Sequence, residues 1–272
     1  MKRLRNAGKE IAEDQDCELV MKIGPFTVLR KGKPLLGKSM VDDRPLLFNE
    51  AVNFDREAIF IAVPKTGTTS IRRQLRMQGP KLIPNPHLTI RQVRDGLYTY
   101  LLKQSLGGNA EFPTKAAVVL SDDEIREKAA DIFKRYFKFA SVRNPWARVV
   151  SLYKRREGVR VSDRMEFEVF CEGLKYASDT CSHPTRAISQ LDWMTDENGE
   201  LLVDFVLRLE EHAAGLEEIN ARTAGRLGLE EMHLNSNPNS NASSCRSMYS
   251  DKTRKLVEEA CRRDIEYFGY EF

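Results

Sequence analysis

Short apolar runs alternate with longer amphipathic segments along most of the chain, an arrangement typical of proteins in which helices cover a sheet. An uninterrupted apolar run at 59–63 and a mostly apolar segment at 139–142 indicate two buried strands. Helical patterns predict helices at 68–78, 89–104, 121–136, 210–227 and 251–267. Strands that alternate with helices predict an α/β fold, with a mainly parallel sheet flanked by helices.

Two local signals add detail to this pattern. Ser121 and Glu124 have the spacing of a capping box, which predicts that a helix begins there. Segments rich in apolar residues at 190–194 and 201–206, separated by a polar turn at 196–199, predict a pair of strands.

The first buried strand runs into a polar turn with the composition of a phosphate-binding loop. The sequence PKTGTTS at 64–70 precedes a helical pattern, so unpaired N–H groups and the positive end of the helix dipole face the turn. Gly67 allows the backbone to approach an anion closely, and Lys65 supplies a point charge. In the usual nucleotide-triphosphate loop the lysine follows the last glycine, whereas Lys65 precedes Gly67. The shorter loop therefore predicts a site for one phosphate group.

A second strand–turn–helix unit, KFASVRNPWARVVSLY, occupies residues 138–153. Pro145 suits the first turn of a helix. Arg143 lies at the end of the strand, where its planar fork of donors can grip a phosphate with two hydrogen bonds. Ser151, eight positions after Arg143, could add a hydroxyl to the same anion. Two such units in one chain indicate a phosphorylated ligand.

In this order, PKTGTTS and the segment RNPxxRxVSxY resemble the PAPS-dependent sulfotransferases, where PAPS is 3′-phosphoadenosine 5′-phosphosulfate. The resemblance is to the group that contains carbohydrate O-sulfotransferases and their bacterial relatives. Three further segments also fit that group: residues 87–94, 203–211 and 264–272. The resemblance implies a P-loop-like sulfotransferase fold from about residue 58 onward. It also implies that the first loop holds the 5′-phosphosulfate and the second unit the 3′-phosphate, since the spacing of Arg143 and Ser151 matches the family pattern.

The resemblance further implies a reaction and its cosubstrate. A sulfuryl group would pass in line from PAPS to a hydroxyl, or an amine, of an acceptor such as a glycan or a small metabolite. The product would be 3′-phosphoadenosine 5′-phosphate (PAP). Lys65 is expected to bind the leaving oxygen and the transferring group, which makes a metal unnecessary. The nucleotide is expected to bind Lys65, Thr66, Gly67, Thr68, Thr69, Ser70, Arg143, Ser151 and Arg246.

An acceptor hydroxyl also needs a base, and histidine is the usual choice near neutral pH. The chain has four histidines. His87 is the candidate base, because the segment HLTIRQVR that it opens resembles the family's histidine segment after the first loop. His233, in a His-Leu-Asn sequence that recurs in relatives, is the alternative.

Composition restricts the partners and the compartment. With 41% hydrophobic and 31% charged residues the chain suits a globular protein, and a net charge of +3 gives no general attraction to nucleic acid. No apolar run approaches the ~18 residues of a membrane span, and the basic N-terminus lacks the apolar region of a secretory signal, so a cytoplasmic protein is expected. Five scattered cysteines without C-x-x-C spacing argue against a zinc site. We expect a partly mobile N-terminal extension at 1–50 and a single domain at 51–272.

Two other functions compete with sulfuryl transfer. A P-loop kinase or NTPase would place its lysine after the glycine and an acidic magnesium ligand on a second strand, which here ends in Arg143. A non-catalytic relative would bind the nucleotide without turnover, which the presence of Lys65 and His87 disfavours. Acceptor loops vary within the family, so these patterns leave both a glycan and a small metabolite open, and they do not address the oligomeric state.

Overall fold

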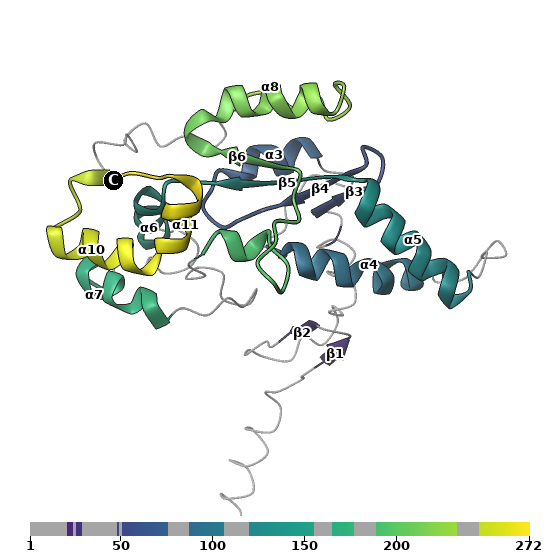
Figure 1. Ribbon diagram of the computed structural model, residues 1–272, viewed down its shortest axis with the longest axis horizontal. Helices are drawn as coiled ribbons and strands as arrows, with labels where there is room; N and C mark the ends of the chain where they lie inside the picture. The colour runs from purple at the N-terminus through teal and green to yellow at the C-terminus, as the bar shows by residue number, and fades with distance from the viewer. Residues whose placement is uncertain are drawn as a thin grey trace, which may run out of the picture.

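A mixed four-stranded sheet forms the centre of the molecule (Figure 1). The computed structural model describes residues 21–23, 26–28, 48, 51–75, 87–105, 120–154, 165–176, 189–232 and 245–272. In spatial order, the strands are β3 (Val52–Asn53), β4 (Ala58–Ile61), β5 (Phe137–Val142) and β6 (Phe205–Arg208). β3 is antiparallel to β4, whereas β4, β5 and β6 are parallel. The prediction of an α/β fold with a mainly parallel sheet is therefore confirmed.

The sheet is covered on both faces because successive side chains of each strand point in opposite directions. Ile59 and Ile61 of β4 belong to one apolar core, whereas Ala58 and Phe60 belong to a second. The first core is covered by α4 (Ile90–Ser105), α5 (Asp122–Arg135), α6 (Pro145–Tyr153), α7 (Phe167–Glu172), α10 (Asp251–Ala260) and α11 (Arg262–Phe268). The second is covered by α3 (Thr68–Leu75) and α8 (His212–Arg222). Burial on both faces explains the uninterrupted apolar run in β4.

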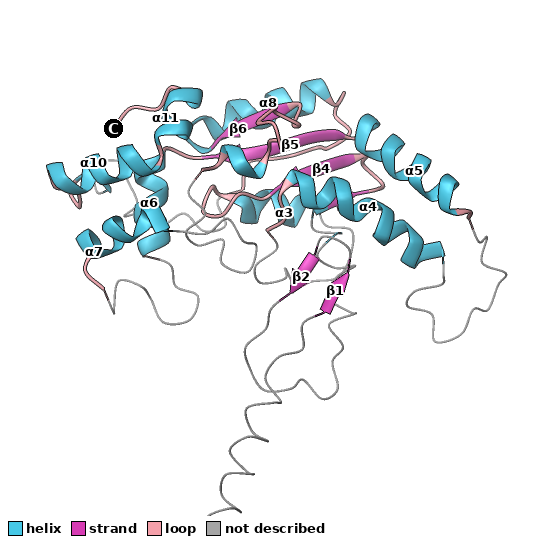
Figure 2. Ribbon diagram, turned by 60° about the horizontal axis from the view of Figure 1, so that its bottom comes forward, coloured by secondary structure: helices cyan, strands magenta, loops and turns pink. Residues whose placement is uncertain are grey.

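The carboxyl ends of the three parallel strands lie together (Figure 2). Ile61 of β4 pairs with Ala140 of β5, and Val142 of β5 pairs with Arg208 of β6. The segments that follow these strands therefore leave the sheet at one edge, where open α/β sheets bind their ligands.

Shorter elements connect or precede this framework. β1 (Met21–Ile23) and β2 (Phe26–Val28) form an antiparallel pair. The 3-10 helices are η3 (Gly173–Tyr176), η4 (Leu191–Trp193) and η5 (Leu209–Glu211). In the part of the chain that the structure describes, no helix combines the length and the apolar character needed to cross a bilayer.

Several predicted elements are confirmed, and one pair is wrong. Ser121 accepts a hydrogen bond from the backbone of Glu124, and the Glu124 side chain accepts one from the backbone of Ser121, so the capping box opens α5 as predicted. The predicted strand pair at 190–194 and 201–206 is not formed. The first part turns as η4, β6 is parallel to β5 instead, and one isolated bridge joins Thr195 to Leu201.

The predicted helices at 210–227 and 251–267 also differ from the structure. The first is shorter, since α8 ends at Arg222. The second is divided into α10 and α11 at Cys261, whose ψ of 17° interrupts the helical backbone.

Candidate functional site

The loop after β4 is anchored to β5 through Thr66. The Thr66 Oγ1 donates a hydrogen bond to the Val63 carbonyl at 2.9 Å and lies 2.6 Å from the Ser141 Oγ in β5. Because the Thr66 proton points to a carbonyl, Ser141 is the donor in the second contact. Thr66 is 1% exposed. Its side chain is thus engaged within the protein, and the backbone N–H is the group that it can offer to a ligand.

The backbone of this loop turns sharply on either side of Thr66. Lys65 has a φ of 69° and Gly67 a φ of 77°, whereas Thr66 does not have a positive φ. Alternation of this kind directs neighbouring N–H groups into a concave surface that suits an anion. A Cβ at Gly67 would lie 2.5 Å from the Cδ1 of Leu209, which begins η5. Gly67 is therefore required both for its backbone conformation and for its close approach to Leu209.

The remaining polar residues of the motif lie in the first turn of α3. Thr68 and Ser70 are buried, and the Ser70 Oγ donates to the Gly67 carbonyl at 3.3 Å. Thr69 and Lys65 are half-buried. Within the loop, Lys65 and Thr69 are therefore the polar side chains with the most access to solvent and to a ligand.

A buried arginine from the second unit supports the first loop. The Arg148 Nε on α6 donates to the Pro64 carbonyl at 3.0 Å, and the residue is 2% exposed. Burial lowers the pKa of the Arg148 guanidinium. This role of Arg148 was not predicted from the sequence. The available signal was the position of Arg148 three residues after Pro145 and four before Leu152, on the buried side of the helix.

The second unit presents Arg143 at the end of β5. Its backbone is held by Gln190: the Arg143 N–H donates to Gln190 Oε1 at 2.9 Å, and Gln190 Nε2 donates to the Arg143 carbonyl at 2.8 Å. Burial lowers the pKa of the Arg143 guanidinium, while the nearby Cys245 and Glu210 act in the opposite direction. Among the described residues, no hydrogen bond or ion pair engages that guanidinium. A desolvated cation of this kind gains most from an arriving anion.

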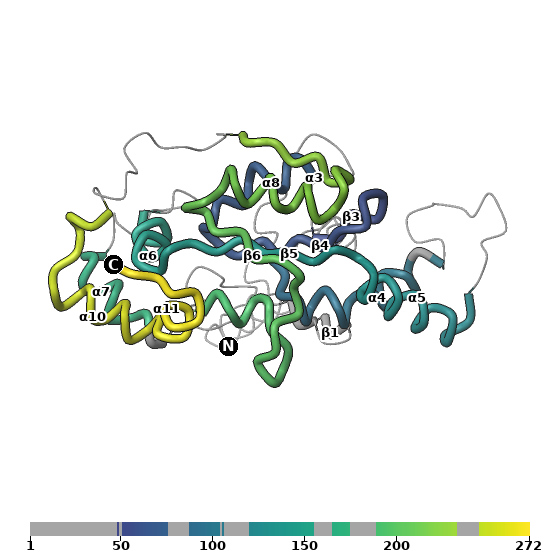
Figure 3. The backbone as a smooth tube through the Cα atoms, turned by 45° about the horizontal axis from the view of Figure 1, so that its top comes forward, coloured from purple at the N-terminus to yellow at the C-terminus, as the bar shows by residue number. Residues whose placement is uncertain are grey.

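Asn144 fixes the start of α6 and ties it to the end of the chain. Its Oδ1 caps the helix by accepting from the backbone of Trp146 at 3.1 Å and of Ala147 at 3.3 Å. Its Nδ2 donates to the Glu271 carbonyl at 2.7 Å, and its N–H donates to Glu210 Oε1 at 2.7 Å. Figure 3 shows the C-terminal tail ending beside α6. The second unit is thus enclosed by residues from later in the chain.

The other two residues predicted for the 3′-phosphate lie in different surroundings. Ser151 lies on α6 and is half-buried. Arg246 is exposed, and its guanidinium carbon lies 5.8 Å from the ring centroid of Phe272. Cys245, which lies close enough to Arg143 to influence its pKa, directly precedes Arg246.

His87 lies beside the first loop. Its Nδ1 is 2.5 Å from the carbonyl of Ala62, two residues before Pro64. A carbonyl can only accept, so Nδ1 carries the proton and Nε2 is the ring nitrogen that can accept one. The imidazole packs edge-on against Trp193, with ring centroids 6.0 Å apart. The alternative base, His233, lies outside the described residues.

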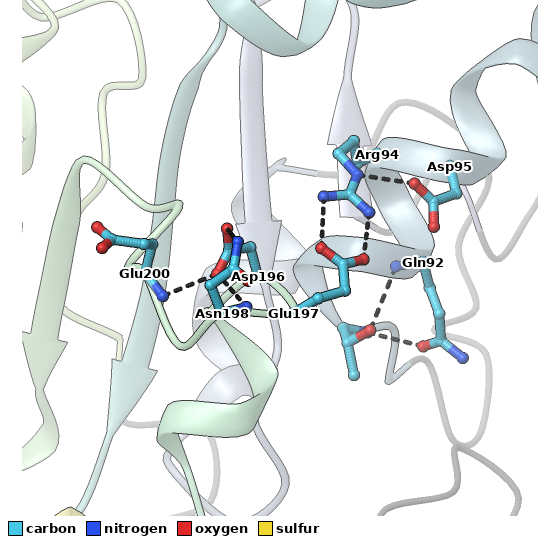
Figure 4. Close-up of polar contacts among 8 residues, drawn as sticks. Gln92, Arg94, Asp95, Asp196, Glu197, Asn198 and Glu200 are labelled. Atoms are coloured by element: carbon cyan, nitrogen blue, oxygen red, sulfur yellow. Dashed lines mark hydrogen bonds and ion pairs between the residues drawn. The ribbon is translucent and has the colours of Figure 1, made fainter.

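A polar tie links α4, which follows His87, to the turn at 196–199 (Figure 4). Arg94 donates to the Glu197 carboxylate from both terminal guanidinium nitrogens, Nη2 at 2.6 Å and Nη1 at 3.2 Å, and its Nε donates to Asp95. The same turn is closed by Asp196, which accepts from the backbone of Asn198 and Glu200.

Within the described residues, no group of three or more histidine, cysteine or acidic side chains is arranged to hold a metal.

Comparison of the sequence with known proteins identifies a matching family model but no individual relative. The family model described as Sulfotransferase family matches residues 51–271. No curated protein and no solved structure matches the chain.

Proposed function

Because this chain belongs to the sulfotransferase family, we propose that it transfers a sulfuryl group from PAPS to a hydroxyl or an amine of an acceptor. One observation carries the proposal. The ends of β4 and β5 lie side by side, and they bring a loop shaped for an anion next to an arginine that is desolvated and has no ion pair among the described residues. We also propose that residues 51–272 form the catalytic domain and 1–50 an extension, since the family match begins at residue 51.

The first unit suits the 5′-phosphosulfate. The N–H groups around Thr66 and Gly67, together with the start of α3, supply donors and a positive dipole to the 5′-phosphate. Thr68, Thr69 and Ser70 complete this side of the proposed site. The ammonium of Lys65 would neutralise the charge that develops on the leaving phosphate oxygen, which is where electrostatic stabilisation accelerates the transfer most. A metal is not required in this scheme.

The second unit suits the 3′-phosphate. The guanidinium of Arg143 can bind it with two charge-assisted hydrogen bonds. We assign Ser151 and Arg246 supporting contacts on the same phosphate. Such a phosphate distinguishes PAPS from common nucleotides, so Arg143 would select the cosubstrate.

His87 is the proposed base. As the acceptor oxygen attacks sulfur, the bond between sulfur and the bridging phosphate oxygen breaks and PAP leaves. Nε2 of His87 takes the acceptor proton, while Nδ1 stays bonded to the Ala62 carbonyl and keeps the ring oriented. The acceptor would be a hydroxylated glycan or a small metabolite.

Calorimetric titration with PAP, beside ATP with magnesium, tests the nucleotide site. We expect the wild-type protein to bind PAP in preference to ATP with magnesium, and Arg143→Ala to lose PAP binding by at least about 100-fold, as expected for removal of a charged phosphate contact. Binding of ATP with magnesium but not PAP would instead indicate a kinase or NTPase. Tight PAP binding without turnover of PAPS on a broad acceptor panel would indicate a non-catalytic relative.

A further inference from the structure

The segment at residues 189–194, here the bridging segment, joins the two halves of the proposed site. Figure 1 shows it beneath the sheet, between α4 and α11. At one end Gln190 holds the backbone of Arg143, and near the other Trp193 packs against His87. Gln190 is 0% exposed and Trp193 is 1% exposed. The segment is therefore buried in the structure and touches both halves.

Gln190 makes two hydrogen bonds with the backbone of Arg143. One side-chain amide satisfies both the N–H and the carbonyl of the same residue, at 2.9 and 2.8 Å. A neighbouring strand would offer the same pair of bonds, but beyond Val142 the ladder to β6 has ended. The amide therefore restrains the backbone dihedrals of Arg143 where no strand does so, and with them the direction of its guanidinium.

The backbone of Gln190 is in turn held by Asp264 on α11. The buried Asp264 carboxylate accepts from the Gln190 N–H at 2.8 and 2.7 Å, from the Leu191 N–H at 3.2 Å and from the Ser189 hydroxyl at 2.9 Å. Burial raises the pKa of this carboxyl, while these hydrogen bonds and the charge of Arg148 act in the opposite direction. The contacts form a continuous path from α11 through Gln190 to Arg143.

We propose that Gln190 is a positioning residue that holds Arg143 in the orientation needed to bind the 3′-phosphate of the cosubstrate. The inference rests on the proposed function and deepens it. Gln190 does not touch the ligand in this account and acts through the Arg143 backbone. Its loss should therefore reduce recognition of the 3′-phosphate while leaving recognition of the 5′-phosphate intact.

The test compares two ligands on variants of the full chain. Gln190→Met keeps the length and volume of the side chain but removes both hydrogen bonds. We expect it to weaken PAP binding about tenfold and to leave binding of adenosine 5′-phosphate, which has no 3′-phosphate, unchanged. A purely structural defect would weaken both ligands to the same degree.

The chain offers a matched control in Gln74. Its amide brackets the backbone of Glu230 in the same manner, with Nε2 to the carbonyl at 2.9 Å and the N–H to Oε1 at 2.7 Å. Gln74→Met should leave the ratio of the two affinities at the wild-type value. If Gln190→Met does not fold, Gln190→Asn withdraws the amide by one carbon and is measured in its place.

The outcomes separate this inference from the proposed function. A Gln190 variant that retains the wild-type preference for PAP overturns the positioning role and leaves the proposed function standing. A wild-type protein that does not prefer PAP to adenosine 5′-phosphate overturns the proposed function, and this assignment with it.

Discussion

The two strand–turn–helix units at the edge of the sheet are held in shape by different means. The first turns through its own backbone, with positive φ values at Lys65 and Gly67. The second has no positive φ between Arg143 and Pro145. It is held by groups from later in the chain. The Gln190 side chain binds the backbone of Arg143, 47 residues before it, and the Glu271 carbonyl accepts from the side chain of Asn144, 127 residues before it.

The shape of the first unit is therefore set mainly by nearby residues, whereas that of the second is set by residues distant in the sequence. The shape of the first loop follows from the residues of the motif, with support from Ser141 and Arg148 in the second unit. The shape of the second turn depends on the bridging segment and on the C-terminal tail. Mutations far from the motif should therefore disturb the proposed 3′-phosphate site more than the proposed 5′-phosphate site.

The largest effect is expected where the support of the second unit is removed. Asp264→Ala leaves the buried donors of Ser189, Gln190 and Leu191 without their acceptor. We expect the free energy of unfolding to fall by about 4 kcal/mol, measured by chemical denaturation. Glu266→Ala, an exposed position on the same helix, is the control and should change stability little. Equal stability of the two variants would show that the support is dispensable.

The next effect concerns the backbone of the first loop. Gly67→Ala forces a side chain into a left-handed conformation and toward Leu209, and should cost about 2 kcal/mol of unfolding free energy. Gly199→Ala is the control, because Gly199 has a φ of 85° and no atom within 4 Å of an added Cβ. That variant should cost about 1 kcal/mol from the backbone alone. If both variants lose the same amount, the approach of Leu209 contributes nothing.

Two threonines of the first loop should behave differently. Thr66→Val removes a buried hydroxyl that contacts Val63 and Ser141, and should cost about 1–2 kcal/mol of unfolding free energy. Thr69→Val changes a half-buried residue, so we expect near-normal stability and weaker binding of adenosine 5′-phosphate. Denaturation and calorimetry on the same samples separate the two effects. The reverse pattern would mean that Thr66, rather than Thr69, offers its hydroxyl to the ligand.

The smallest effect is expected at the exposed tie between Arg94 and Glu197. The hydrogen bonds from Arg94 lower the pKa of Glu197 to about 2. A lowered carboxyl pKa stabilises the fold above the ordinary pKa near 4.5, and this contribution is lost as the pH falls toward 2. Glu197→Gln should therefore lower the melting temperature slightly at pH 7, since exposed pairs are screened by solvent, and by less at pH 2.5. A large change at pH 7 would indicate that the tie is a structural support.

Most of the framework could be predicted from local patterns. The run at 59–63, the capping box at Ser121 and the motif helices are encoded over a few residues, and the structure has them. The strand pair expected at 190–194 failed because the Asp264 carboxylate binds two consecutive N–H groups and turns the backbone into η4. An acid 74 residues away from Gln190 leaves no local periodic signal.

The same reasoning applies to the candidate site. Lys65, Gly67 and Arg143 lie in motifs whose spacing indicates phosphate binding. The supporting roles of Arg148 and Gln190 could not be predicted, because the sequence alone does not distinguish a buried arginine or glutamine from an exposed one. Arg148 and Gln190 donate to the backbone carbonyls of Pro64 and Arg143, and a residue of any type could supply such a carbonyl.

The central claim is that the first unit binds the 5′-phosphate and the second unit the 3′-phosphate. The most direct measurement is calorimetric titration of PAP, adenosine 5′-phosphate and adenosine 3′-phosphate into wild type, Lys65→Met and Arg143→Met. We predict that Lys65→Met weakens the two ligands with a 5′-phosphate and spares adenosine 3′-phosphate. Arg143→Met should weaken the two ligands with a 3′-phosphate and spare adenosine 5′-phosphate. Variants that weaken all three ligands equally, or that exchange these patterns, would contradict the assignment.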